Sequence, residues 1–304
     1  MKEEYDSMKN LEAAVAAQVA RMNHIAREKM DNLSPLDISQ LIYHPFEETC
    51  PLAFRQDLTS ETVLQMPFMK LLHGFLLEAA EPRGIQLTKG GNLNVKLVKS
   101  LYGQRLLLDE MIERGFCKLN KEKDVVWIQN IRLLATLSGL AKNGKEQLTL
   151  TARGRKLVEA EDWPTIFQWV FLTQLRKFNM GYHDGYPETD AQLLCPYVLY
   201  LLVRYGHDTR PLTFYVEKFV QAFPILLTQA APTHGTPTHQ LQNMLGTRLF
   251  NRFLKFYGMV DVVDSNEYYK LDGKPMTITT TKLFTAALEL RSDRFAFTRP
   301  EHLA

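Results

Sequence analysis

The chain of 304 residues is long enough for two domains, and its 45% hydrophobic and 23% charged residues are typical of a globular protein. Its three cysteines, Cys50, Cys117 and Cys195, show no CxxC spacing, which favours buried thiols in a reducing compartment over disulfides or a zinc site. The first ten residues lack the apolar core of a signal peptide, and no apolar run approaches the roughly 20 residues that span a bilayer. A cytoplasmic protein without membrane contact is therefore expected.

The net charge of +2 conceals a basic central block. Residues 83–156 hold 15 Lys/Arg against 6 Asp/Glu, whereas residues 1–82 hold 7 against 13 and residues 157–304 hold 14 against 15. Phosphate backbones attract such a block because binding releases their counterions. A lysine-rich solvated surface is the alternative, and charge alone does not decide between the two.

The first predicted element is one long helix over residues 3–31, which has no Pro or Gly and ends before Ser34-Pro35. An apolar stripe at heptad-like spacing, interrupted by Gln18 and Lys29, is formed by Met8, Leu11, Val15, Met22 and Ile25. A helix of this length needs a partner for that stripe. Packing against the body of the same chain is the preferred interpretation, and pairing with a second copy, which would make a homodimer, is the alternative.

The centre of the chain shows an ordered series of turn and cap signals. A helix over 125–139 is predicted from the spacing of its apolar residues, and it stops at Gly139. The Asn143-Gly144 step then indicates a hairpin between 140–142 and 147–150, and Thr151 caps a further helix over 153–160. The order of helix, basic-tipped hairpin and helix resembles the winged-helix pattern of MarR-like regulators.

The pattern recurs near the end of the chain. Alignment of Gly139 with Gly258 superposes apolar positions at an offset of 119, and LTLT (148–151) then matches MTIT (276–279) at an offset of 128, after a hairpin nine residues longer. A helix over 281–290 is expected next. Between the two units the sequence predicts helices at 191–205 and around 211–223.

These signals predict a mostly α fold with short β-hairpin wings, in which two winged-helix-like units are joined by a helical region and preceded by the long N-terminal helix. The predicted parts are the N-terminal helix (1–33), a loop-rich connecting segment (34–66), a basic first winged-helix-like domain (67–160), a helical middle region (161–227) and a second winged-helix-like domain (228–304).

Four segments carry a resemblance to a group of uncharacterised bacterial winged-helix proteins: SPLDISQLIYHPFEETCPL (34–52), LTKGGNLNVKLVKSL (87–101), LTLTARGRKLVE (148–159) and NMGYHDGYP (179–187). Some members of that group carry an appended SEC-C zinc motif. The present chain has no cysteine-rich tail, so that zinc site is not carried over. The resemblance implies a fold, and it implies no activity.

The candidate DNA-binding residues lie in the basic block. The face of helix 125–139 opposite the core carries Gln129, Arg132 and Thr136, whose side chains suit base edges in a major groove. Phosphate contacts are assigned to Lys142, Lys145, Arg153, Arg155 and Lys156, with an upstream extension through Lys89, Lys96 and Lys99. In the second unit a similar stripe, formed by Arg248, Asn251, Arg252 and Lys255, is followed by an acidic wing with Asp261, Asp264 and Glu267, so a structural or protein-binding role is expected there.

Catalytic signals are weak. His183-Asp184 is the most enzyme-like pair, but neither residue has a partner visible in the sequence, and Tyr182 and Tyr186 are expected to pack this loop against helices. His234 and His239 lack companions for a metal, and no GxxxxGK[ST], GxGxxG or HExxH motif occurs. No catalytic residue, cofactor or metal is therefore predicted. A DNA-binding or regulatory protein is the favoured function, a protein-interaction scaffold or component of a bacterial multi-protein system is the alternative, and an enzyme ranks third.

Overall fold

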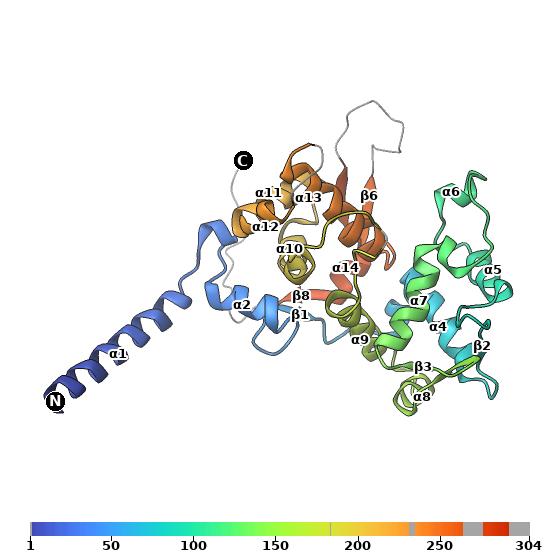
Figure 1. Ribbon diagram of the computed structural model, residues 1–304, viewed down its shortest axis with the longest axis horizontal. Helices are drawn as coiled ribbons and strands as arrows, with labels where there is room; N and C mark the ends of the chain where they lie inside the picture. Colours follow the sequence, from blue (N-terminus) through green and yellow to red (C-terminus); the bar gives the residue numbers. More distant parts are fainter. Residues whose placement is uncertain (1, 183, 231–234, 264–275, 292–304) are drawn as a thin grey trace.

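The computed structural model describes residues 2–182, 184–230, 235–263 and 276–291 (Figure 1). Within these ranges the chain is mostly helical, with one two-stranded and two three-stranded antiparallel sheets. The predicted mostly α fold with small hairpins is confirmed. Among the described helices, none is long and apolar enough to cross a membrane.

The N-terminal helix α1 (Lys2–Asn23) extends away from the body of the molecule (Figure 1). Leu11, Val15 and Met22 are exposed, so the rest of the chain does not cover the apolar stripe. The helix ends earlier than predicted because residues 24–33 turn back towards later helices. Asp31 adopts a left-handed conformation with φ of 56°, and its buried carboxylate forms an ion pair at 2.6 Å with Lys218.

The segment after α1 contains more regular structure than the predicted loop-rich connection. Its elements are η1 (Glu28–Met30), α2 (Pro35–Tyr43), β1 (Leu52–Phe54) and α3 (Ser60–Gln65). Ser34 and Asp37 form a capping box that starts α2. Strand β1 pairs antiparallel with β8 (Leu288–Leu290), so two segments at opposite ends of the chain lie side by side.

The first three-stranded unit contains the predicted helix and hairpin. It comprises α4 (Pro67–Ala80), β2 (Ile85–Gln86), α5 (Val95–Gly103), α6 (Glu110–Glu113), η2 (Glu122–Asp124), α7 (Val126–Leu137), β3 (Ala141–Asn143) and β4 (Gln147–Leu150). The strand order is β2-β4-β3. Ile128, Ile131 and Leu134 of α7 are fully buried, and α7 packs against α4. Gly139, with φ of 75°, ends α7 and leads into the hairpin, as predicted.

The second three-stranded unit begins upstream of residue 228. After α8 (Ala152–Glu159) and α9 (Trp163–Arg176), it comprises α10 (Ala191–Tyr205), β5 (Arg210–Pro211), α11 (Leu212–Ala222), α12 (Ile225–Gln229), α13 (Pro237–Leu245), the π-helix η3 (Gly246–Leu254), β6 (Val260–Val263) and β7 (Thr277–Thr280). The strand order is β5-β7-β6. Because β5 comes from the predicted middle region, that region contributes to the second sheet.

The two units match at the level of single hydrogen bonds. The Thr151 hydroxyl donates to the Gly139 carbonyl at 2.7 Å, and the Thr281 hydroxyl donates to the Gly258 carbonyl at 2.7 Å. Thr281 lies 130 residues after Thr151, so the predicted offset of 128 was wrong and the second hairpin is 11 residues longer than the first. The offsets of 128 and 130 differ by two residues, and a shift of two residues along a strand keeps the same side chains facing inward. The apolar pattern therefore fits both offsets, and the threonine cap distinguishes them.

The last described elements also differ from the prediction. The helix expected over 281–290 is shorter, because α14 (Lys282–Ala287) ends where β8 begins to pair with β1. At the centre of the molecule, α9 packs against both α7 and α10. Its rings Phe167 and Phe171 are fully buried and contact Tyr257. The two units therefore share one aromatic core.

Candidate nucleic-acid interface

Arg132, the central residue of the predicted base-reading face, is committed to a buried ion pair. Its Nε and Nη2 donate to the carboxylate of Glu122 over distances of 2.5–3.1 Å. The side chain of Glu122 is 0% exposed and that of Arg132 is 11% exposed. Glu122 also accepts a hydrogen bond from the Leu93 backbone N–H at 2.7 Å. Through Glu122, Arg132 of α7 is therefore connected to η2 and to the residue Leu93 before α5. This geometry favours a structural role of the guanidinium over a base contact.

The other two residues of that face also turn towards the chain itself. The Thr136 hydroxyl donates to the carbonyls of Arg132 and Leu133 in its own helix, at 3.1 and 2.9 Å. Gln129 lines a cavity whose opposite wall includes Arg252 of η3. A helix that reads bases needs this face free to enter the major groove. In this fold η3 and the end of α9 lie across the cavity from Gln129 and so limit access to this part of the α7 face.

Two of the predicted phosphate ligands are engaged within the protein. The Arg153 guanidinium lies over the Trp169 ring, 3.0 Å from its centroid. Arg155 donates to the Ala80 carbonyl at the end of α4 and lies 3.9 Å from the carboxylate of Glu159. Both residues connect α8 to neighbouring helices.

Five other predicted residues are exposed, on or next to β2, α5 and β3, elements that lie at the end of the molecule far from α1 (Figure 1). We call them the lysine edge: Lys89, Lys96, Lys99, Lys142 and Lys145. No ion pair with any of the five occurs among the described residues. A hydrogen bond of 2.8 Å from the Leu87 N–H to the Glu146 carbonyl brings the loop of Lys89 beside the hairpin turn. Lys156 of α8 is exposed as well.

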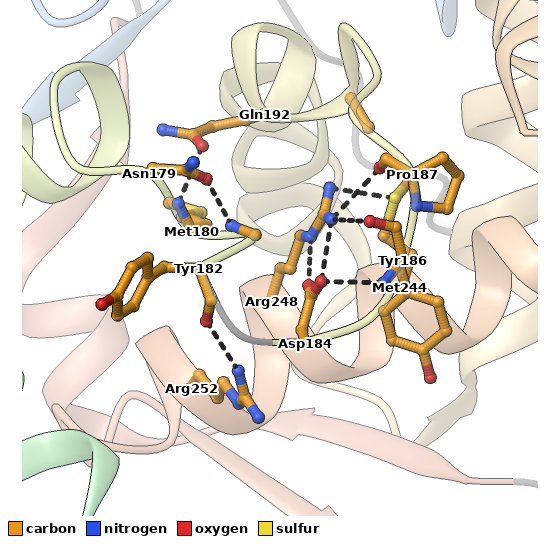
Figure 2. A network of polar contacts seen from close by, with 12 residues as sticks. Asn179, Met180, Tyr182, Asp184, Tyr186, Pro187, Gln192, Met244, Arg248 and Arg252 are labelled. Atoms are coloured by element: carbon orange, nitrogen blue, oxygen red, sulfur yellow. Dashed lines mark hydrogen bonds and ion pairs between the residues drawn. The ribbon is translucent and has the colours of Figure 1, made fainter. Parts of the chain in front are cut away.

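In the second unit, the predicted basic stripe is divided. Arg248 is buried and forms an ion pair with Asp184. The Nε and Nη2 atoms of Arg248 donate to the Asp184 carboxylate at 2.5 and 3.1 Å (Figure 2). Arg248 also donates to the carbonyls of Tyr186 and Pro187. The exposed positions are Lys255 and the acidic Asp261, while Asp264 and Glu267 lie outside the described residues.

The loop at 179–187 is held by this ion pair. Asp184 acts as its anchor on η3, a role that the sequence did not reveal because its partner is 64 positions away. Tyr186 packs against the core as predicted, and Tyr182 is 43% exposed. His183 lies outside the described residues, as does His234. His239 is exposed and lies 3.1 Å from the Asn243 amide nitrogen.

Among the described residues, no group of three or more His, Cys, Asp or Glu side chains could hold a metal ion. Burial raises the pKa of the Cys195 thiol to about 12, which keeps it protonated at neutral pH. Burial also raises the pKa of Cys50. These two thiols are therefore placed as core residues.

Comparisons of the chain with family models, with curated proteins and with solved structures give no match in any of the three. The geometry of the chain itself therefore carries the functional argument. The residues predicted to bind nucleic acid fall into two groups. The lysine edge is exposed to a partner, whereas Arg132, Arg153 and Arg155 form contacts within the fold.

Proposed function

We propose that the chain is a tandem winged-helix protein. Each three-stranded unit begins with a helix and a short strand, continues with at least three helices and ends with a two-stranded hairpin, and in each sheet the first strand pairs with the third. The registers also correspond, with Ile85 opposite Leu148 in one sheet and Arg210 opposite Ile278 in the other. This order and pairing are those of a helix-turn-helix module extended by a wing.

The function that we propose is binding of duplex nucleic acid through the lysine edge, by contacts to phosphates. The observation that carries it is the exposure of five lysines on one hairpin, on α5 and on the loop before α5, none of which forms an ion pair with a described residue. Each ammonium on a phosphate releases counterions, so such a surface binds with little sequence preference. The buried state of Arg132 supports backbone contacts over base readout.

Replacement of Lys142 and Lys145 by Gln tests this proposal. We expect weaker binding to every duplex and a smaller salt dependence, measured as the slope of log K against log salt. The slope should fall by roughly 0.9 for each phosphate that the variant no longer neutralises. Fluorescence anisotropy with two unrelated duplexes, at several salt concentrations, measures both quantities.

The matched control is the double replacement of Arg153 and Arg155 by Gln. These residues are as basic as the two lysines but are engaged with Trp169 and the Ala80 carbonyl, so their replacement should leave the salt slope unchanged. A wild-type protein without salt-sensitive binding, or a slope that depends on the arginines and not on the lysines, would contradict the proposal.

A second candidate function, assembly with a protein partner, is favoured by one observation, the uncovered apolar stripe of α1. We propose a second copy of the chain as the partner, in antiparallel orientation. Within α1, residues 2–12 hold four acidic and two basic side chains, whereas residues 13–23 hold one basic side chain and no acidic one. Antiparallel pairing therefore places unlike charges together while it buries Leu11, Val15 and Met22.

Deletion of residues 1–23 should convert this dimer into a monomer, as measured by sedimentation equilibrium. The cut leaves Asp31 and its ion pairs with Arg204 and Lys218 in place, so the body of the protein should keep its stability. Replacement of Val15 and Met22 by Glu in the full chain should have the same effect on mass. A full-length protein that sediments as a monomer at micromolar concentration would refute the pairing.

A further inference from the structure

The segment between α5 and α7 carries apolar side chains that no described residue covers. We call residues 105–123 the α6 arm, because they contain α6, which projects from the first unit next to α5 (Figure 1). Phe116 is 70% exposed, Met111 51% and Leu108 50%, and the Phe116 N–H donates to the Met111 carbonyl at 2.9 Å. The Phe116 ring contacts no other ring and no cation among the described residues. Apolar side chains grouped in this way mark a surface that meets a partner.

Polar contacts hold the α6 arm in one conformation. The Tyr102 hydroxyl at the end of α5 donates to the Glu113 carboxylate at 2.9 Å, and Arg105 forms an ion pair with Glu113 at 2.6 Å. Glu110 forms an ion pair with Arg114. Because the tip is already ordered, a partner that binds it does not have to order it first. The two glutamates of α6 are compensated by arginines, so they oppose an anionic partner only weakly.

Positive charge follows the exposed ring along the chain. Three exposed lysines come within seven residues of it: Lys118, Lys121 and Lys123. Lys118 and Lys123 form no ion pair with a described residue, and Lys121 lies 4.0 Å from the Asp124 carboxylate. The acidic residue among them, Glu122, is 0% exposed and is neutralised by Arg132. An aromatic ring among lysines is the pattern of a surface that stacks a base on the ring and binds phosphates with the ammonium groups.

The α6 arm continues the lysine edge. In α5, Lys96, Lys99 and Gly103 are exposed and follow one another at i, i+3 and i+7, so they share one face of the helix. The chain passes from the end of this face into Arg105 and the arm. A nucleic-acid strand whose phosphates contact Lys96 and Lys99 is therefore led towards the tip that carries Phe116.

We propose that the α6 arm binds a single strand that extends from the duplex, with a base stacked on Phe116 and the next phosphates on Lys118 and Lys123. The inference rests on the proposed duplex binding and specifies its substrate as a duplex with a single-stranded extension. Only an unpaired base has a face free for the ring, since the faces of paired bases are covered by their neighbours in the stack. A membrane surface is the competing occupant, but α6 has four residues and is too short to lay an amphipathic face on a bilayer.

Anisotropy titrations of the full chain with three probes test this assignment. The probes are a blunt duplex, the same duplex with a single-stranded tail of about ten thymidines, and the same duplex with an abasic tail of equal length. Both tails carry the same phosphates, so their difference isolates the bases. We expect the thymidine tail to bind roughly tenfold more tightly than the abasic tail, and Phe116→Ala to abolish this difference while the blunt duplex binds as before. Lys118→Gln should lower the salt slope of both tailed probes by about 0.7 and leave that of the blunt duplex unchanged.

Tyr43→Ala is the matched control, because it removes a ring of α2 that is 60% exposed, and it should leave the preference for the thymidine tail unchanged. Circular dichroism verifies that each variant is folded. Equal affinities for the two tails, or a preference that Phe116→Ala retains, would overturn the assignment. Phe116-dependent binding to anionic phospholipid vesicles without a preference between the tails would also overturn it, in favour of a membrane surface.

The same titrations separate this assignment from the proposed duplex binding. The combined replacement of Lys142 and Lys145 by Gln should weaken binding to all three probes alike and preserve the ratio between the two tails. A wild-type protein that binds only the tailed probes, with the expected difference between them, would contradict the duplex proposal and support the role of the α6 arm. Absence of binding to all three probes would overturn both.

Discussion

Replacement of Gly154 by Ala is expected to lower the free energy of unfolding by about 3 kcal/mol, in the range of a severe packing clash. A Cβ atom at Gly154 would lie 2.0 Å from the Leu140 carbonyl oxygen, a backbone atom that cannot rotate away. Helix α8 would have to move off β3, against the Thr151 cap that joins the two. Urea unfolding followed by circular dichroism measures the change.

Gly74→Ala is the matched control, because Gly74 also lies within a helix. A Cβ at that position meets no atom within 4 Å, so the substitution should raise the free energy of unfolding by roughly 0.5–1 kcal/mol through the lower backbone entropy of the unfolded chain. Equal effects of the two substitutions would show that the close approach of α8 to β3 does not determine stability.

Replacement of Arg132 by Met is expected to destabilise the protein by about 3–5 kcal/mol, since it leaves the fully buried Glu122 without its cation. Arg55→Met, which breaks more exposed ion pairs with Asp57 and Glu289, should destabilise the protein much less than Arg132→Met does. The additional change Glu122→Gln should recover much of the stability, because the amide oxygen can still accept the Leu93 N–H while the unpaired charge is removed.

The double variant also separates the two possible roles of Arg132. If this residue acts only within the fold, the refolded Arg132→Met/Glu122→Gln protein should bind duplexes with the sequence preference and salt slope of the wild type. A weaker sequence preference at unchanged stability would restore the base-reading interpretation and contradict the assignment of this arginine to the interior.

The features that the sequence predicted correctly depend on residues close together in the chain. Gly139 and Gly258 end their helices because they adopt positive φ at little steric cost, and Thr151 caps α8 through a neighbouring backbone N–H. The apolar spacing of α7 placed its core face correctly for the same reason, since helical periodicity is a local property. The exposure of the hairpin lysines Lys142 and Lys145 was also predicted correctly, because it depends on the local turn.

The sequence did not predict which residues from other elements form ion pairs or strand pairs with a given residue. Glu122 binds Arg132, and Asp184 binds Arg248 across 64 positions. The pairing of β1 with β8 joins residues more than 230 positions apart, and its three-residue strands are too short for a periodic signal.

The sequence by itself therefore determined the helix that ends at Gly139, the hairpin after it and the basic character of this part of the chain, because helix caps, turns and apolar periods act within a few residues. Only the tertiary structure decided which cations remain free, how far the second unit extends, and that α7 and η3 face a common cavity. A polar helix face is accessible only if no other element packs in front of it, and the helical period contains no information on that packing.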